Sequence, residues 1–419
     1  MDANRFATHS LKDERVLRIL SAALEAVDPY KAVQKYLPDV SGRVYGLAIG
    51  KASIPMLTAL AEAYPLSGAL AISKHASVLS RNLFPVFVGS HPIPDSRSLE
   101  AGYRVLEFVS ALHEDDKLVC LISGGGSALV TAPFDKITLE DMQTLTSLLL
   151  TCGARIDEIN TIRRSLDRVK GGGLARATKA KIVSLILSDV IGNPLEAIAS
   201  GPTFPNPTTN ADALAILEKY RLIDRTPITI YELLTSASPL AGDGGGSVMN
   251  IIIGDNRLAA QAALEQAQRE GIHAEILTNE LQGEARDVGV MLAKQLRNEV
   301  TKRPRPFCLI AGGETTVTLT GNGKGGRNQE LALAAVDELR GLENVLLIAL
   351  ATDGEDGPTD AAGAVATGKT FQMAERLGVD AAVHLSRHDA YVCFDALGDL
   401  MRTGPSGTNV NDLIFLIAL

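Results

Sequence analysis

The chain has 419 residues, and a chain of this length is expected to form more than one domain. Its 46% hydrophobic and 21% charged residues are typical of globular proteins, and its 38 glycines indicate many tight turns. The net charge of -9 at pH 7, with scattered basic residues, argues against nucleic acid as a partner.

The four cysteines lie far apart and form no metal-binding pattern, which predicts reduced thiols and a cytoplasmic location. The start of the chain lacks the apolar stretch of a signal peptide. No apolar run approaches the ~18 residues that suggest a membrane span. We therefore expect a soluble protein without a membrane partner.

The first half of the chain alternates between predicted helices and strands. Residues 13–27 place apolar side chains on one helical face. Glycine turns and helices then separate short apolar runs, a rhythm that predicts an α/β fold with a parallel sheet covered on both faces. The runs are VYGLAI (44–49), ALAIS (69–73), VFVGS (86–90), KLVCLIS (117–123) and KIVSLIL (181–187).

Residues 202–250 are rich in proline, glycine and threonine, which predicts a linker. We expect an N-terminal domain over residues 1–235 and a C-terminal domain over residues 236–419. A second strand-and-helix rhythm follows the linker. Its predicted strands are NIIIG (250–254), HAEIL (273–277), FCLIAG (307–312), TVTLTG (316–321) and VLLIALA (345–351).

The segment CLISGG (120–125) has a near copy, CLIAGG (308–313). Open α/β sheets bind ligands at the carboxyl ends of their strands, so the residues after each strand are the first candidates. The turn Ser123, Gly124, Gly125, Gly126, Ser127 could present backbone amides to a phosphate. A glycine turn without a ligand remains an open alternative, and no Walker lysine is present.

Two charged residues follow other strands of the first half. Lys51 comes after the first strand, where a bound anion would explain a cation at a helix start. Asp189 follows the run 181–187, and a helix is predicted after it, from Pro194 to Gly201. Such a carboxylate could accept a hydroxyl proton during phosphoryl transfer. A turn aspartate bound to its own loop is the alternative. His91 and Asp95 in HPIPD have no specific signature.

In the second half, GNGKGGRNQ (321–329) contains GxGxxG, a weak dinucleotide signal on its own. Its Lys324 and Arg327 suit phosphate or carboxylate binding, although a solvated arginine would look the same. The run ATDGEDGPTDAAG (351–363) offers Asp353 and Asp356 as Mg²⁺ ligands, with a solvated acidic turn as the alternative.

The chain resembles the class II glycerate kinases, also called the glycerate 2-kinase family. The motifs that carry the resemblance occur in this order: LISGGGSALV, VKGGGLA, LSDVIGNPLEAIASGPT, GGETTVTLTGNGKGGRNQELAL, ATDGEDGPTDAAGA and GTNVND.

The resemblance implies two doubly wound αβα domains: an N-terminal, Rossmann-like domain and a C-terminal MOFRL-type domain with a mixed sheet. It implies an active site in the interdomain cleft and ATP- and Mg²⁺-dependent phosphorylation of D-glycerate, to 2-phosphoglycerate. Lys51, Asp189 and Arg327 match the family's active-site residues. We place Glu314 and Asn409 in the same site, near nucleotide and substrate. Monomer and homodimer are both open.

Two other functions are compatible with parts of the sequence. An NAD(P)-dependent hydroxypyruvate reductase would use the GxGxxG of residues 321–326, but no acid follows at a strand end ~20 residues later. A regulator that binds sugar acids is the second alternative, but no basic face or helix-turn-helix pattern is evident.

Overall fold

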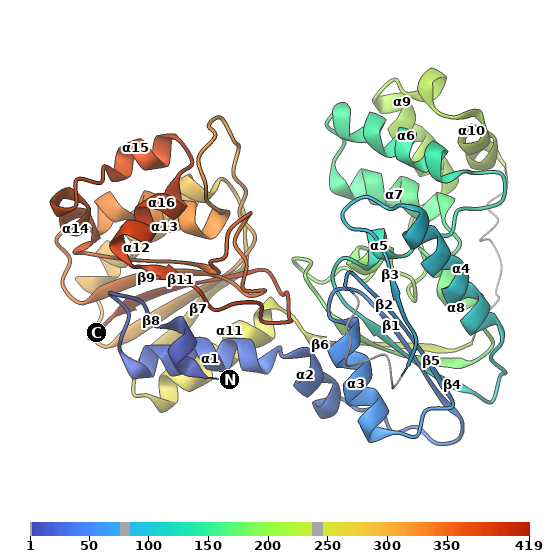
Figure 1. Cartoon of the computed structure of the whole chain (residues 1–419), viewed down its shortest axis with the longest axis horizontal. Helices are drawn as coiled ribbons and strands as arrows, with labels where there is room; N and C mark the ends of the chain where they lie inside the picture. Colours follow the sequence, from blue (N-terminus) through green and yellow to red (C-terminus); the bar gives the residue numbers. More distant parts are fainter. Residues whose placement is uncertain (1, 76–83, 237–245) are drawn as a thin grey trace. The chain divides into compact units, whose positions relative to one another are not determined.

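The structure, a computed structural model, describes residues 2–75, 84–236 and 246–419. The chain forms two compact units, each with its own six-stranded sheet (Figure 1). The parallel-sheet unit comprises Pro29–Ile253, and the mixed-sheet unit joins Met1–Asp28 to Gly254–Leu419. The expected two-domain α/β architecture, with a mixed sheet in the second domain, is confirmed.

The sheet of the parallel-sheet unit has the strand order β3-β2-β1-β4-β5-β6. The pairs β2–β3, β1–β2, β1–β4 and β4–β5 are parallel. Leucine, isoleucine and valine dominate these strands, as burial on both faces requires. The strands are β1 (Val44–Ile49), β2 (Gly68–Ser73), β3 (Val86–Val88), β4 (Lys117–Ile122), β5 (Lys181–Leu187) and β6 (Val248–Gly254).

Helices cover both faces of this sheet. The face with Leu47 and Ile122 packs against Val105 and Val109 of α4 (Ser96–Ser110). The other face packs against α3 (Ser53–Ala63). The remaining short helices of the sheet layer are α2 (Pro29–Lys35), α5 (Gly126–Leu129), α8 (Gly173–Arg176) and the 3-10 helix η2 (Ile198–Ser200).

A second, purely helical core lies in the same unit. It is formed by leucine and isoleucine side chains, among them Leu145, Ile162, Leu217 and Ile230. The helices that carry these side chains lie next to one another in Figure 1. They are α6 (Leu139–Thr151), α7 (Ile156–Leu166), α9 (Asn210–Lys219) and α10 (Ile228–Thr235), with the 3-10 turn η3 (Ile223–Arg225) between the last two.

The sheet of the mixed-sheet unit has the order β11-β10-β9-β12-β8-β7. The pair β7–β8 is parallel, whereas β12 is antiparallel to both β8 and β9, and β10 is antiparallel to β9 and β11. The strands are β7 (His273–Leu281), β8 (Phe307–Gly313), β9 (Val345–Ala351), β10 (Gly363–Thr367), β11 (Leu400–Met401) and β12 (Asp412–Ala418).

Two helical layers enclose this sheet. On one face α12 (Ala285–Val300) and α13 (Arg327–Leu339) pack closely, since an added Cβ at Gly289 would overlap the Leu331 carbonyl. On the other face lie α11 (Asn256–Arg269) and α1 (Glu14–Ala26), whose N-cap is Asp13. The remaining elements are η1 (Ala3–Phe6), α14 (Thr370–Arg376), α15 (Ala381–Ser386) and α16 (Ala390–Leu397).

The two units do not follow the expected division at residue 235. The opening helix α1 belongs to the mixed-sheet unit because its apolar face packs on α11, and Arg18 forms an ion pair with Glu270 at 2.7 Å. The strand β6, expected to start the second domain, instead extends the first sheet beside β5. The division at residue 235 therefore misplaced two elements.

Three local predictions also differ from the structure. The expected linker contains helices α9 and α10, and its residues 237–245 lie outside the described residues. Residues 194–201 form a turn and the 3-10 helix η2 instead of an α-helix, with Ala199 at φ 50°. The segment 316–321 forms no strand and has only a single bridge, between Thr316 and Glu284, because Leu319 and its neighbours are exposed rather than packed.

All four cysteines are free, and burial raises the pKa of the Cys120 and Cys308 thiols to about 12. These two thiols are therefore unreactive near neutral pH. Within the described ranges, no helix has both the length and the apolarity to cross a bilayer.

Candidate active site

Three strand ends of the parallel-sheet unit meet at one edge of the sheet. Ile49 of β1 is in register with Ile122 of β4, and Ile122 with Ile186 of β5. The residues that follow these strands therefore lie side by side, at the edge where open α/β sheets bind ligands. They are the predicted site residues Lys51, Ser123–Ser127 and Asp189.

The turns after β1 and β4 interlock. The Lys51 amide donates to the Gly124 carbonyl at 2.9 Å, and the Ala52 amide donates to Ser123 Oγ at 3.0 Å. Gly50 has φ +131°, and an added Cβ there would overlap Ser123. The buried Ser123 hydroxyl thus fixes the two turns against each other, and its binding to a nucleotide stays a prediction.

Charged and polar side chains surround the next two glycines. An added Cβ at Gly124 would overlap the Asp189 carboxylate. At Gly125, with φ +83°, a Cβ would lie 3.2 Å from His91 Cδ2 and 3.3 Å from Lys51 Cγ. The structure therefore brings the predicted acid and the predicted cation to the same glycine turn, together with His91.

His91 lies beside this turn, although the sequence pattern ranked it low. It follows β3, and burial, reinforced by the charges of Lys51 and Lys74, lowers its pKa below the ordinary value. The imidazole is therefore neutral at pH 7. The composition of HPIPD predicts only a turn. The position of His91 directly after a predicted strand could have identified it as a candidate site residue. Asp95, by contrast, caps α4 by accepting from the Arg97 and Ser98 amides.

The last two residues of the predicted phosphate-binding turn begin the short helix α5. A Cβ added at Gly126 would lie 2.8 Å from Ala199 Cβ. Ser127 Oγ lies 2.7 Å from Ser200 Oγ. The turn is therefore fixed by the loop before Gly201, while Gly124 and Gly125 remain the positions nearest to Asp189 and Lys51.

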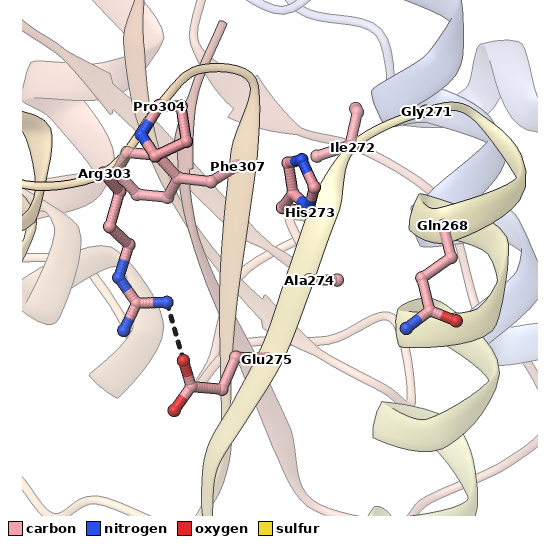
Figure 2. A pocket seen from close by; sticks show the side chains of 9 residues that line it. All are labelled: Gln268, Gly271, Ile272, His273, Ala274, Glu275, Arg303, Pro304 and Phe307. Atoms are coloured by element: carbon pink, nitrogen blue, oxygen red, sulfur yellow. Dashed lines mark hydrogen bonds and ion pairs between the residues drawn. The ribbon is translucent and has the colours of Figure 1, made fainter.

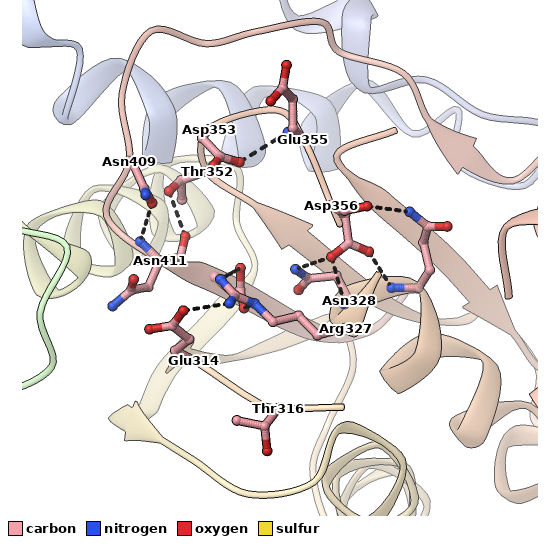
Figure 3. Close-up of polar contacts among 12 residues, drawn as sticks. Glu314, Thr316, Arg327, Asn328, Thr352, Asp353, Glu355, Asp356, Asn409 and Asn411 are labelled. Atoms are coloured by element: carbon pink, nitrogen blue, oxygen red, sulfur yellow. Dashed lines mark hydrogen bonds and ion pairs between the residues drawn. The ribbon is translucent and has the colours of Figure 1, made fainter. Parts of the chain in front are cut away.

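In the mixed-sheet unit, Arg327 lies between two carboxylates (Figure 3). Its Nε and Nη2 donate to Asp412 at 2.6 and 3.2 Å, and its Nη1 donates to Glu314 at 2.5 Å. Asp412 is fully buried at the start of β12, whereas the Glu314 side chain is 43% exposed. The arginine is therefore fixed by Asp412 and held more loosely by Glu314.

The carboxylates also keep Arg327 charged. Burial by itself lowers the pKa of its guanidinium, but the charges and hydrogen bonds of Asp412 and Glu314 outweigh burial and raise it above the ordinary value. A permanently charged guanidinium at a helix start can bind a phosphate or carboxylate ligand with two parallel hydrogen bonds. Such a ligand would compete with Glu314 for the guanidinium.

Asp356, a predicted metal ligand, serves mainly to hold α13. It is buried, and its two oxygens accept from the Asn328 amide at 3.1 Å, the Gln329 amide at 2.8 Å and Asn328 Nδ2 at 3.2 Å (Figure 3). A carboxylate at this place satisfies the first amides of the helix and interacts well with its dipole. Metal binding by Asp356 stays a prediction.

Asp353 and Asn409 lie in neighbouring turns beside Thr352 and Asn411. Asp353 Oδ1 accepts from the Glu355 amide at 3.1 Å, and Asn409 Oδ1 accepts from the Asn411 amide at 3.1 Å (Figure 3). Across the described part of the chain, no group of three histidine, cysteine or acidic side chains is arranged to hold a metal ion. Roles for Asp353 in metal binding and for Asn409 in substrate binding stay predictions.

The GxGxxG of residues 321–326 has a packing explanation. An added Cβ at Gly321 would lie 2.7 Å from the Arg387 carbonyl, and one at Gly323 would lie 2.7 Å from Asp389 Cβ. Lys324 lies over the Tyr391 ring, with Nζ 3.8 Å from its centroid. These glycines therefore let the loop approach the turn before α16, and nucleotide binding by Lys324 stays a prediction.

A pocket of about 590 Å³ lies in the mixed-sheet unit, away from Arg327 (Figure 2). It is lined by His273 and Phe307, the first residues of β7 and β8, and by the ion pair of Arg303 with Glu275 at 2.7 Å. It therefore lies at the amino ends of these parallel strands, opposite the end where Glu314 follows β8. By the rule for ligand sites in such sheets, it is not the active site.

Two family models match the chain. Residues 15–235 match a domain of unknown function, DUF4147, and residues 307–412 match the MOFRL family. A glycerate 2-kinase from Pyrococcus horikoshii is 39% identical, over 96% of this chain and 96% of its own. A D-glycerate 2-kinase from Thermotoga maritima is 41% identical, over 98% and 99%.

The chain belongs to the glycerate kinase family with a C-terminal MOFRL domain. A crystal structure of the glycerate kinase from Thermotoga maritima matches the fold with a TM-score of 0.89 and 39% identity, over 96% of this chain and 98% of that one. The resemblance that the motifs predicted is thereby confirmed. A further relative, from Agrobacterium vitis, carries a provisional name as a hydroxypyruvate reductase and is 38% identical, over 98% of this chain and 95% of its own.

Proposed function

We propose that this protein is a cytoplasmic D-glycerate 2-kinase that uses ATP with Mg²⁺ and forms 2-phosphoglycerate. The observation that carries the proposal is the convergence of Asp189 and Lys51 on the turn Gly124–Gly125. A carboxylate and a cation at a glycine turn are the parts that phosphoryl transfer to an alcohol requires. The glycerate 2-kinase names of the relatives support the choice of substrate.

In the proposed reaction the substrate hydroxyl attacks the γ-phosphorus of ATP. An O–P bond forms to the substrate oxygen, the bond from phosphorus to the bridging oxygen breaks, and ADP leaves with that electron pair. Asp189 accepts the hydroxyl proton, as a general base at a strand end can do. Lys51 stabilises the negative charge on the transferring group. His91, neutral at pH 7, adds no second charge beside Lys51.

Arg327 is proposed to bind an anionic group of nucleotide or substrate. Its bidentate contact with the buried Asp412 fixes the plane of the guanidinium, and Nη1 becomes available when the exposed Glu314 moves away. Because Lys51 and Asp189 belong to one unit and Arg327 to the other, the sharing of one active site by both units stays a prediction.

The turn fits a phosphate group because Gly124 and Gly125 have no side chain that would block its approach. Mg²⁺ usually keeps several waters and is bound by one or two carboxylates together with phosphate oxygens. Asp353 is the proposed carboxylate ligand, and Asp356 already accepts with both oxygens from the first amides of α13. Bound ATP supplies the phosphoryl group.

A hydroxypyruvate reductase is the second candidate, because one relative carries that name. A reductase would need the GxGxxG of residues 321–326 for its dinucleotide. Those glycines are instead required by the approach of Arg387 and Asp389. Kinase activity is therefore the better-supported function.

The test is a pair of assays on the purified protein. We expect ADP release that depends on D-glycerate and on a divalent cation, with a phosphorus NMR signal of 2-phosphoglycerate. Oxidation of NADH or NADPH with hydroxypyruvate should be absent. Glycerate-independent ADP release, or hydroxypyruvate reduction by the pure protein, would overturn the proposal.

A further inference from the structure

A small cavity adjoins the glycine turn in the parallel-sheet unit. It lies between α6 and α7 and the residues that follow His91, and it has about 20 Å³ of free space. Its lining combines apolar side chains with three hydroxyls, one amide and two cations. The residues used below are Ile93, Pro94, Ser127, Met142, Arg163 and Lys170.

The charge of Lys170 is already balanced within the fold. Lys170 Nζ forms an ion pair with Asp167 at 2.5 Å and donates to the Val130 carbonyl at 2.9 Å, and both charged side chains are fully buried. Asp167 also accepts from Thr131 Oγ1 at 2.7 Å and from the Val169 amide at 2.9 Å. An ammonium group has three donors, so one donor of Lys170 is left over.

Arg163 is not balanced in this way. Among the residues that the structure describes, no hydrogen bond or ion pair holds its guanidinium, although the side chain is partly buried. Burial lowers its pKa, and Arg163 in turn acts on Lys170 as a like charge. The neighbouring Arg164 shows the contrast, since it donates to Asn206 at 2.8 Å and to Thr161 at 3.1 Å.

The cavity therefore has one excess positive charge and spare donors on Arg163 and Lys170. Burial of a charge without a partner is costly, so a partly buried, unpaired guanidinium favours an anion beside it. The size of the cavity restricts the anion, because about 20 Å³ admits one or two water-sized atoms. A carboxylate group fits this limit, whereas a nucleotide triphosphate does not.

We propose that Arg163, with Lys170 and Ser127, binds the carboxylate of the acceptor substrate and so positions its hydroxyl near the turn Gly124–Gly125. The inference rests on the proposed function and identifies the part of the chain that recognises the acid. The apolar Ile93, Pro94 and Met142 exclude water from the ion pair and strengthen it.

The experiment compares Arg163→Met with the wild type and with Arg168→Met. Arg168 lies five residues further along the chain, and its side chain is 43% exposed, so its loss controls for the removal of one arginine. We expect Arg163→Met to raise the KM and the calorimetric Kd for D-glycerate about 10- to 100-fold, the value of one or two charged hydrogen bonds. The KM for ATP should be unchanged, and so should all constants of Arg168→Met.

Two further measurements keep the inference testable. Glyceramide, which has a neutral amide in place of the carboxylate, should bind equally weakly to the wild type and to Arg163→Met. If Arg163→Met does not fold, Arg163→Lys should still raise the Kd for D-glycerate several-fold, because an ammonium cannot replace a bidentate fork. An unchanged Kd in the lysine variant would overturn the inference.

The outcomes separate this inference from the proposed function. Glycerate-dependent ADP release by the wild type, with an unchanged glycerate Kd in Arg163→Met, would overturn the inference alone. A raised KM for ATP with normal glycerate binding would assign the cavity to a phosphate and overturn it as well. Glycerate binding that needs Arg163, without ADP release, would overturn only the proposed function.

Discussion

The segments CLISGG (120–125) and CLIAGG (308–313) have nearly the same sequence but different surroundings. The first lies in the parallel-sheet unit, where β4 ends at Ile122 and its glycines meet the side chains of Asp189 and Lys51. The second lies in the mixed-sheet unit, where β8 continues through Gly313 and its glycines meet Asn256 and the backbone of Leu281.

The difference comes from the strands on either side. β4 runs between the parallel strands β1 and β5, so three strand ends and their loops converge at its glycines. β8 is paired with the antiparallel β12 up to Gly313, so its glycines are part of the sheet and allow close packing. The glycines of the first segment therefore lie in a turn after their strand, whereas those of the second segment lie within the strand itself.

The largest effect is expected at the acid beside the first segment. Asp189→Asn should keep the fold and lower kcat by ~10² to 10⁴, because the amide cannot accept the hydroxyl proton. Steady-state rates and a thermal melt check this, with Asp135→Asn, an exposed aspartate, as the control. A lowered melting temperature with full activity per folded molecule would instead make Asp189 a turn-stabilising residue.

The two glycine pairs can be compared directly with matched variants. Gly124→Ala should lower kcat by ~10²-fold, because its methyl group would displace the Asp189 carboxylate. Gly312→Ala should chiefly lower the free energy of unfolding, by ~1–3 kcal/mol, because its methyl group would overlap Asn256, which donates to the Val410 and Asp412 carbonyls. If both variants lost only stability, the contrast between the segments would fail.

A variant of Arg327 tests whether the mixed-sheet unit contributes to activity as well as to stability. Arg327→Met should lower activity and also destabilise the fold by ~1–3 kcal/mol, because the buried Asp412 loses its partner. Adding Asp412→Asn should restore most of the stability without restoring activity. Chemical denaturation and steady-state rates separate the two effects, and a double variant that regains full activity would show that Arg327 is only structural.

The smallest effect concerns the electrostatics beside the first segment. Burial and then Lys51 lower the pKa of His91, so Lys51→Met should raise this pKa toward its ordinary value, as measured by NMR titration. A depressed histidine pKa gives stability that is present above the unfolded value of 6.5 and lost as the pH falls through the folded pKa. His91→Gln should therefore flatten the stability profile below pH 6.5.

Much of this arrangement was predictable from local sequence. Alternating apolar runs and glycine turns predicted the strands β1, β4 and β5, and the carboxyl-edge rule then placed Lys51 and Asp189 together. The interlocked turn of Ser123 with Ala52 was not predictable, because the hydrogen bond joins residues far apart in sequence. The position of His91 beside the glycine turn could be predicted only from the order of the strands in the sheet.

The errors have one physical origin. The run of β6 is apolar and can pair with any open sheet edge, so its sequence does not say which sheet it joins. The threonine-rich segment 316–321 has the composition of a strand, but it finds no neighbouring strand. The contacts of Asp356 with the start of α13 were not predicted either, because its partners Asn328 and Gln329 precede it by more than twenty residues. Each outcome depends on distant contacts rather than on local propensity.

The pairing of α1 with α11 has a consequence for synthesis on the ribosome. The apolar face of α1, with Val16, Leu20 and Leu24, is made first, but its partner helix comes only after the entire parallel-sheet unit. At translation rates of ~5–20 residues per second, this face waits for tens of seconds. The nascent chain thus completes the parallel-sheet unit before the mixed-sheet unit, and the apolar face of α1 lacks its packing partner in that interval.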